Sequence, residues 1–176
     1  MLATRRLIES DKVDIIVGGG NASGLAMAMV PLAEKAGVPF LSTEGAMTIV
    51  NPVAERKWVF KATMDDDTVL DRALDSFAKR HIDTIALLSD SSGFGQSAKE
   101  QMQKVAAKHK VKVVYETFNP ADTDLTAQLT RIKDAGAKAI ICWTITPTGV
   151  VFLKQAQQVG LPKGTVLMHS YGFVDA

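Results

Sequence analysis

The stretch that decides the fold is Val13-Asp14-Ile15-Ile16-Val17-Gly18-Gly19-Gly20-Asn21-Ala22-Ser23-Gly24, an apolar run that ends in a loop of small residues. Residues 13–17 are mostly β-branched and stop at glycine, which predicts a short strand buried on both faces of a parallel sheet. The glycines allow a sharp turn, and we expect Asn21 or Ser23 to cap the helix that follows. Free N–H groups at the start of such a helix bind an anion, a carboxylate as readily as a phosphate.

The rest of the chain repeats this unit of strand, small-residue loop and helix. Further strands are predicted over residues 38–41, 58–61, 84–89, 111–118, 139–144 and 165–169. Helices are predicted over residues 2–10, from the glycine loop to Gly37, after Asp65-Asp66-Asp67, and over 94–109, 122–135 and 148–159. This alternation with short connections predicts an α/β fold, in which open parallel sheets carry helices on both sides and the crossovers are right-handed.

Composition and charge exclude several classes of partner. The chain has 176 residues, 47% of them hydrophobic, with 20 basic and 19 acidic residues and a formal charge of +1. Because the basic residues are dispersed, we expect no nucleic acid partner. The longest apolar runs fall far short of the roughly 20 residues that a membrane-spanning helix needs, so we expect no direct membrane insertion. The single cysteine, Cys142, lies in an apolar run and is expected to be a buried, inert thiol.

Groups that perform chemistry are scarce. The three histidines are His81, His109 and His169, and only His169 ends a predicted strand. No catalytic serine elbow and no zinc-protease motif occurs. Three adjacent acids, residues 65–67, are better explained as first-turn residues that complement a helix dipole than as metal ligands, so we expect no metal site. We therefore expect a protein that is not an enzyme.

A nucleotide cofactor is also not expected. The dinucleotide fingerprint G-x-G-x-x-G finds Gly18 and Gly20, but Ser23 stands where the third glycine belongs. A Walker A loop needs Gly-Lys-Ser/Thr, which is absent. The alternative that stays open is a single-domain α/β enzyme that uses an anion or nucleotide at the Gly18–Gly24 loop.

Several ordered pieces of the chain resemble one known family. They are residues 13–19, 31–42, 58–61 with Asp65, 85–90 with Gly93-Phe94-Gly95, 124–129 continuing to 136–137, and 156–161. Their order and spacing are similar to those of the type I periplasmic solute-binding proteins of the branched-chain amino acid class, which serve ABC transporters. The resemblance covers nearly the whole chain.

This resemblance implies two α/β lobes that close on a ligand. Residues 1–64 would form part of lobe 1 and residues 65–176 most of lobe 2, with the first crossing near Met64-Asp65. Family members are longer and begin with a signal peptide, so the chain resembles a fragment truncated at both ends. A signal peptide upstream, a periplasmic location and a membrane permease as partner are implied.

The family's ligand loops can be placed on this sequence residue by residue. The matching positions are Asn21, Ala22, Ser23, Glu44, Gly45, Ala46, Phe94, Thr144, Thr146 and Tyr171. The first three would hold a ligand carboxylate, and Phe94 would cover the ligand. Amino-acid binders of the family carry a threonine where Ala46 stands and an acid where Tyr171 stands, and these two side chains bind the ammonium group of the ligand.

The missing ammonium partners bear on the ligand class. A buried ammonium without an acid partner is costly, so this pattern favours a small carboxylate without an ammonium, an aromatic or keto acid. If Glu44 turns inward it replaces the lost acid, and a branched-chain amino acid becomes the expected ligand. The effector domain of a sugar-type repressor shares the two lobes, and a DNA-binding helix pair upstream would distinguish it.

Overall fold

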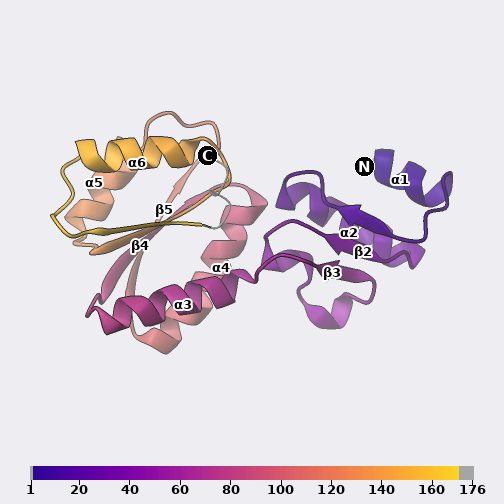
Figure 1. Cartoon of the computed structure of the whole chain (residues 1–176), viewed down its shortest axis with the longest axis horizontal. Coiled ribbons are helices and arrows are strands. Elements are labelled where there is room, and N and C mark those ends of the chain that lie inside the picture. The colour runs from indigo at the N-terminus through magenta and orange to yellow at the C-terminus, as the bar shows by residue number, and fades with distance from the viewer. Residues whose placement is uncertain (1, 171–176) are drawn as a thin grey trace. The chain divides into compact units, whose positions relative to one another are not determined.

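The computed structural model describes residues 2–170 and divides the chain into two compact units. Unit 1 comprises Met1–Asp66 and unit 2 comprises Asp67–Ala176 (Figure 1). Each unit has its own parallel sheet and its own apolar core. The units are therefore described one at a time.

Unit 1 is built around a three-stranded parallel sheet with the order β1-β2-β3. Its strands are β1 (Ile16–Gly18), β2 (Phe40–Ser42) and β3 (Val59–Lys61), and its helices are α1 (Leu2–Glu9), α2 (Ser23–Ala36) and two short 3₁₀ helices, Met47–Ile49 and Val53–Glu55. Ile16, Phe40 and Val59 lie in register across the three strands and are buried in one cluster with residues of α2. Helix α2 ends at Gly37, whose φ of 68° is the left-handed conformation that the sequence predicts there.

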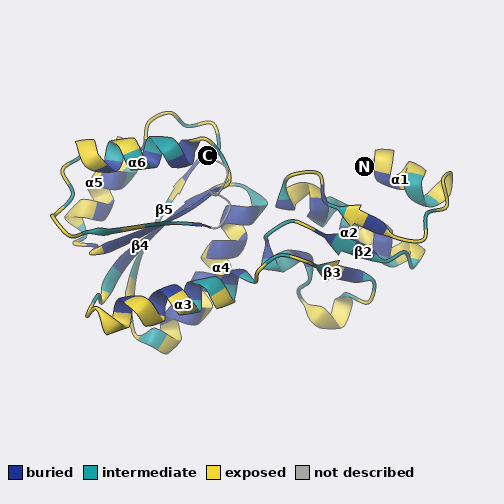
Figure 2. Cartoon of the chain, in the orientation of Figure 1, coloured by how far each residue is buried: buried dark blue, intermediate teal, exposed yellow. Residues whose placement is uncertain are grey.

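The other face of this sheet is exposed, contrary to the sequence prediction for residues 13–17. Val17 and Phe60 belong to a second row in register and are 62% and 52% exposed (Figure 2). Strand β1 is also shorter than predicted, since Val13, Asp14 and Ile15 lie outside it. Among the described residues, β1 pairs with β2 alone, and the face that carries Val17 is left largely uncovered, so its apolar run does not bury both faces.

Unit 2 contains a four-stranded parallel sheet with the order β5-β4-β6-β7. The strands are β4 (Thr84–Asp90), β5 (Lys112–Phe118), β6 (Ala139–Trp143) and β7 (Val166–His169). The helices are α3 (Asp66–Lys79), α4 (Gly93–His109), α5 (Thr126–Asp134) and α6 (Thr148–Gln158). In chain order, helices alternate with strands as the sequence predicts.

Helices cover both faces of the unit 2 sheet. One buried cluster joins α3 and α4 to alternate residues of β4 and β6, including Leu87 and Ile141. The second joins α5 and α6 to the intervening residues, including Leu88 and Cys142. Consecutive strand residues point to opposite faces, so a strand that packs on both sides must be apolar throughout, as β6 is. The prediction of an α/β fold with helix-flanked parallel sheets is confirmed.

Helix α5 begins four residues later than predicted. The carboxylate of Asp124 accepts a hydrogen bond from the backbone N–H of Thr126 at 2.8 Å, and that of Asp122 accepts from Asn119 at 2.8 Å. Both acids bond the backbone of a turn, and such local bonds compete with helix formation. Residues 122–125 therefore form the approach to the helix.

Candidate functional site

The glycine loop of unit 1 leads into α2 without a side-chain cap. Ala22 is the N-cap residue, and no side chain bonds the free N–H groups of the first turn there. Asn21 is exposed, with φ at 61°, and Ser23 is the first helical residue. The prediction that Asn21 or Ser23 caps α2 is therefore wrong, because Ala22 takes the cap position and the hydroxyl of Ser23 has another partner.

That partner is the second loop of unit 1, residues 43–46. The Oγ of Ser23 accepts a hydrogen bond from the backbone N–H of Ala46 at 3.1 Å, and both residues are buried. This bond places two of the predicted ligand loops side by side, at the carboxyl ends of β1 and β2. It leaves the hydroxyl proton of Ser23 available as a donor, beside the N–H groups of the first turn of α2.

Glu44 lies against the glycine loop. A Cβ on Gly19 would lie 2.5 Å from the Cγ of Glu44, so a larger residue at position 19 would displace the Glu44 side chain. The backbone of Glu44 is held on both sides, with its N–H donating to Ser42 Oγ at 3.1 Å and its carbonyl accepting from Thr63 Oγ1 at 2.8 Å. Its carboxylate is half-buried and forms no ion pair with any residue from 2 to 170. Glu44 thus places an acid beside the predicted carboxylate loop.

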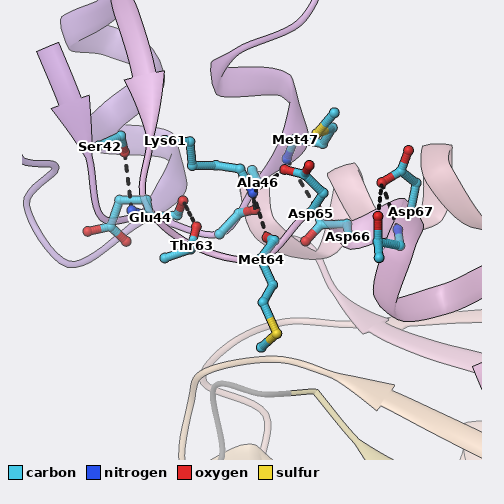
Figure 3. A network of polar contacts seen from close by, with 12 residues as sticks. Ser42, Glu44, Ala46, Met47, Lys61, Thr63, Met64, Asp65, Asp66 and Asp67 are labelled. Atoms are coloured by element: carbon cyan, nitrogen blue, oxygen red, sulfur yellow. Dashed lines mark hydrogen bonds and ion pairs between the residues drawn. The ribbon is translucent and has the colours of Figure 1, made fainter. Parts of the chain in front are cut away.

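The three acids at the end of unit 1 have separate partners (Figure 3). Asp65 pairs with the Lys61 ammonium at 3.1 Å, and the buried Asp66 carboxylate accepts from the backbone N–H of Met47 at 3.1 Å. Asp67 accepts from the N–H of Thr68 at 2.7 Å. Asp66 and Asp67 stand in the first turn of α3, where the sequence places helix-capping acids.

In unit 2, a buried carboxylate connects two further predicted loops. Asp90, at the end of β4, accepts from Thr144 Oγ1 at 2.6 Å and from both the N–H and the hydroxyl of Ser92. The Oγ1 of Thr144 accepts in turn from the N–H of Thr146 at 3.1 Å and lies 2.9 Å from Thr146 Oγ1. Asp90 therefore fixes residues 91–95 relative to residues 144–146.

The aromatic residue predicted to cover the ligand lies in the unit 2 core. Phe94 is 2% exposed, and its ring is 5.4 Å from that of Trp143, centroid to centroid. Gly95 allows this packing, because a Cβ there would overlap the carbonyl oxygen of Asp90. Tyr171, also predicted to contact the ligand, lies outside the described residues.

Two titratable side chains of unit 2 are shifted by burial. Desolvation lowers the pKa of His169 below 6.5, although the carbonyl of Ser170, 3.2 Å from His169 Nδ1, opposes the shift. Burial, with the Asp90 carboxylate as the smaller cause, raises the pKa of the Cys142 thiol far above its usual range. Cys142 is thus a buried thiol that stays protonated, as the sequence predicts.

Sequence reasoning did not foresee the role of Lys61, Asp66 and Asp90 in holding these loops in place. Each lies at the end of a strand or at the start of a helix, where a charged residue is usually solvated. The one usable signal was position, since all of them stand within a few residues of loops at the carboxyl ends of strands. The contacts themselves join residues 16 to 54 positions apart.

The comparisons with known proteins agree with this architecture. The periplasmic binding protein family matches residues 2–176. The chain belongs to this family. As the family is one of binding proteins, the expectation that the chain is not an enzyme is confirmed, and the single-domain enzyme alternative is set aside.

Individual relatives are similar over half of their length or less. The leucine-, isoleucine-, valine-, threonine- and alanine-binding protein of Pseudomonas aeruginosa is 33% identical over 86 residues, which are 48% of this chain and 23% of that protein. An extracellular ligand-binding receptor from Rhodopseudomonas palustris HaA2 has a TM-score of 0.86 at 20% identity, covering 97% of this chain and 47% of that one.

A third relative is a solute-binding protein of an ABC transporter from Rhodopseudomonas palustris BisB5, whose structure contains 3,4-dihydroxybenzoic acid. Its TM-score is 0.75 at 25% identity, with 94% of this chain and 46% of that chain covered. The fold matched is thus that of full-length binding proteins, of which this chain spans about half. Within residues 2–170, no helix is both long and apolar enough to cross a membrane.

Proposed function

We propose that this protein is the extracytoplasmic solute-binding receptor of an ABC importer and binds a small carboxylate, preferably an aromatic or keto acid. It acts in the periplasm and delivers the ligand to a membrane permease. The proposed ligand-binding residues are the ten that match the family's loops: Asn21, Ala22, Ser23, Glu44, Gly45, Ala46, Phe94, Thr144, Thr146 and Tyr171.

The observation that carries the proposal is the hydrogen bond between Ser23 and Ala46. It holds loop 43–46 beside the first turn of α2, where the N–H groups are uncapped. A carboxylate is stabilised there by these donors, by the helix dipole and by the Ser23 hydroxyl. Phe94 packs on the buried Trp143, so its contribution is to hold residues 91–95 in place and not to offer exposed surface to the ligand.

The ligand class follows from the groups that could accept an ammonium. Ala46 has no side-chain oxygen, and the buried Asp90 carboxylate already accepts from Thr144 and Ser92. A ligand ammonium placed against either of these groups would lose water without gaining a free acceptor, which is costly. The relative that contains 3,4-dihydroxybenzoic acid supports a carboxylate of this kind.

The second candidate ligand is a branched-chain amino acid, and Glu44 favours it. Its carboxylate lies against Gly19 and pairs with no described cation, so it is available to an ammonium. The name of the Pseudomonas aeruginosa relative supports this class. Glu44 is then the residue that decides between the two ligands.

The test is a thermal-shift screen followed by calorimetry on the full-length protein. The ligands are 3,4-dihydroxybenzoate, phenylpyruvate, leucine and valine, because a ligand that binds only the folded state raises the melting temperature. We expect the two aromatic acids to bind and Glu44→Gln to retain or strengthen that binding. Binding of leucine and valine alone, lost in Glu44→Gln and kept in the exposed-surface control Glu9→Gln, would establish the amino acid instead.

A further inference from the structure

The ammonium of Lys61 is enclosed by oxygen atoms at the end of β3 (Figure 3). Its Nζ lies 3.0 Å from the carbonyl of Gly45, 2.6 Å from the carbonyl of Met64 and 3.1 Å from Oδ1 of Asp65. The side chain is 3% exposed, although that of Asp65 is 47% exposed. An ammonium has three donors, and here each has an acceptor, which offsets the cost of removing the charge from water.

These contacts join two segments that have different places in the chain. The first is loop 43–47, which contains three of the proposed ligand-binding residues. The second is the crossover, residues 62–66, which leads directly to Asp67, where unit 2 begins. Lys61 bonds both segments at once, through Gly45 on one side and Met64 with Asp65 on the other.

Two further hydrogen bonds run beside the lysine between the same segments. The hydroxyl of Thr63 donates to the Glu44 carbonyl at 2.8 Å, and the N–H of Met47 donates to the Asp66 carboxylate at 3.1 Å. Glu44, Gly45 and Met47 are thus each bonded to residues 61–66, and Ala46 is bonded to Ser23. The loop is fixed between the start of α2 and the crossover.

We infer that Lys61 is a positioning residue that couples the ligand loop to the crossover, so that ligand binding at residues 44–46 restrains residues 62–66. This inference rests on the proposed function. Because the Lys61 ammonium contacts both segments, its removal leaves two carbonyls and a carboxylate without their shared donor. The bonds of Thr63 and Asp66 to the loop remain, so the coupling between the loop and the crossover is weakened.

The test is hydrogen exchange measured by mass spectrometry on the full-length protein. The variants are Lys61→Met, which keeps the length of the side chain and removes its donors, and Lys61→Arg, which keeps the charge. Lys35→Met, on the exposed end of α2, is the matched control. Without ligand, we expect Lys61→Met to raise exchange about tenfold in the peptides that cover 43–48 and 62–67, and to leave that of α1 unchanged.

With a ligand from the screen above, wild-type protein should lose exchange in both peptides. In Lys61→Met, the ligand should lower hydrogen exchange only in peptide 43–48, and its affinity should be at least tenfold weaker. Lys61→Arg should restore part of the exchange decrease in peptide 62–67. Equal protection of 62–67 in wild type and Lys61→Met would overturn the inference. A merely structural lysine would change the melting temperature without uncoupling the two peptides.

The two proposals fail in different ways. If no ligand protects the wild-type protein, the proposed function fails, and the measurement without ligand still tests Lys61. If Lys61→Met does not fold, Asp65→Asn removes the charge of the exposed carboxylate that pairs with Lys61 and leaves the lysine in place. That variant should raise exchange in 62–67 severalfold, and an unchanged rate would count against the coupling.

Discussion

The hydroxyl oxygen of Ser23 accepts a hydrogen bond from the backbone N–H of Ala46 at 3.1 Å, across 23 residues of sequence. A serine at the start of a helix ordinarily bonds an N–H of its own first turn. Here the serine bonds another loop, and the N–H groups of Ser23 and Gly24 at the start of the helix are left without a side-chain cap. One hydroxyl thus assembles the carboxylate side of the proposed site.

Replacing Ser23 with alanine should therefore weaken both folding and binding. The buried N–H of Ala46 loses its acceptor, which costs about 1–3 kcal/mol of folding free energy. The carboxylate ligand loses a hydroxyl donor, which costs about 1 kcal/mol more in binding. Urea unfolding and calorimetry measure the two effects. Ser10→Ala, at an exposed position, is the control and should change neither.

Thr144→Val tests the connection between the unit 2 loops. The change keeps the shape of the side chain but removes the donor to Asp90, which leaves a buried carboxylate with one hydrogen bond fewer. We expect unit 2 to lose about 1–3 kcal/mol of stability. In a Trp58→Phe background, Trp143 is the sole tryptophan, so its fluorescence reports unit 2 alone.

The control for this change is Thr130→Val, which removes an exposed hydroxyl that donates to Thr126 within α5. Its effect should stay below about 0.5 kcal/mol. Equal losses for the two variants would show that the bond between Thr144 and Asp90 contributes nothing particular to unit 2.

Gly95→Ala should destabilise unit 2 severely. The added Cβ overlaps the carbonyl oxygen of Asp90, and backbone atoms cannot move aside as a flexible side chain can. Such overpacking typically costs about 1–3 kcal/mol, and we expect this variant to lie at the upper end because the overlap is with backbone. Gly24→Ala offers the opposite case, because it is helical and has open space around it, so it should stabilise α2 by about 0.5–1 kcal/mol. Thermal unfolding of both variants provides the comparison.

The order of elements could be read from the sequence, because apolar runs, small-residue loops and helix-ending glycines are local signals. Gly37 ends α2 as predicted, and Leu129 and Ile132 face the core of unit 2 as their spacing requires. The exposure of Val17 could not be predicted from such local signals, since it depends on whether another element covers that face of β1.

The candidate site was predictable as a set of loops but not as a set of contacts. The topology of a parallel sheet alone predicts that a ligand binds at the carboxyl ends of its strands, here β1, β2, β4 and β6. The roles of Ser23, Lys61 and Asp90 depend on partners distant in sequence, whose identity no local pattern encodes. Phe94 is the opposite case: the sequence predicts that it contacts the ligand, but its side chain packs on Trp143 in the core.

The stability of unit 2 should fall as the pH decreases below about 6.5, and His169 should account for part of this loss. Burial lowers the pKa of His169 in the folded protein, so the unfolded chain takes up a proton at a higher pH than the folded one does. Its contribution is fully present above the unfolded pKa of 6.5 and is lost as the pH falls from there through the lowered folded value. His169→Gln should flatten the pH dependence of urea unfolding between pH 8 and 5. His81→Gln, at an exposed position, should leave it as steep as in wild type, and an equal slope in the His169 and His81 variants would assign the effect to other groups.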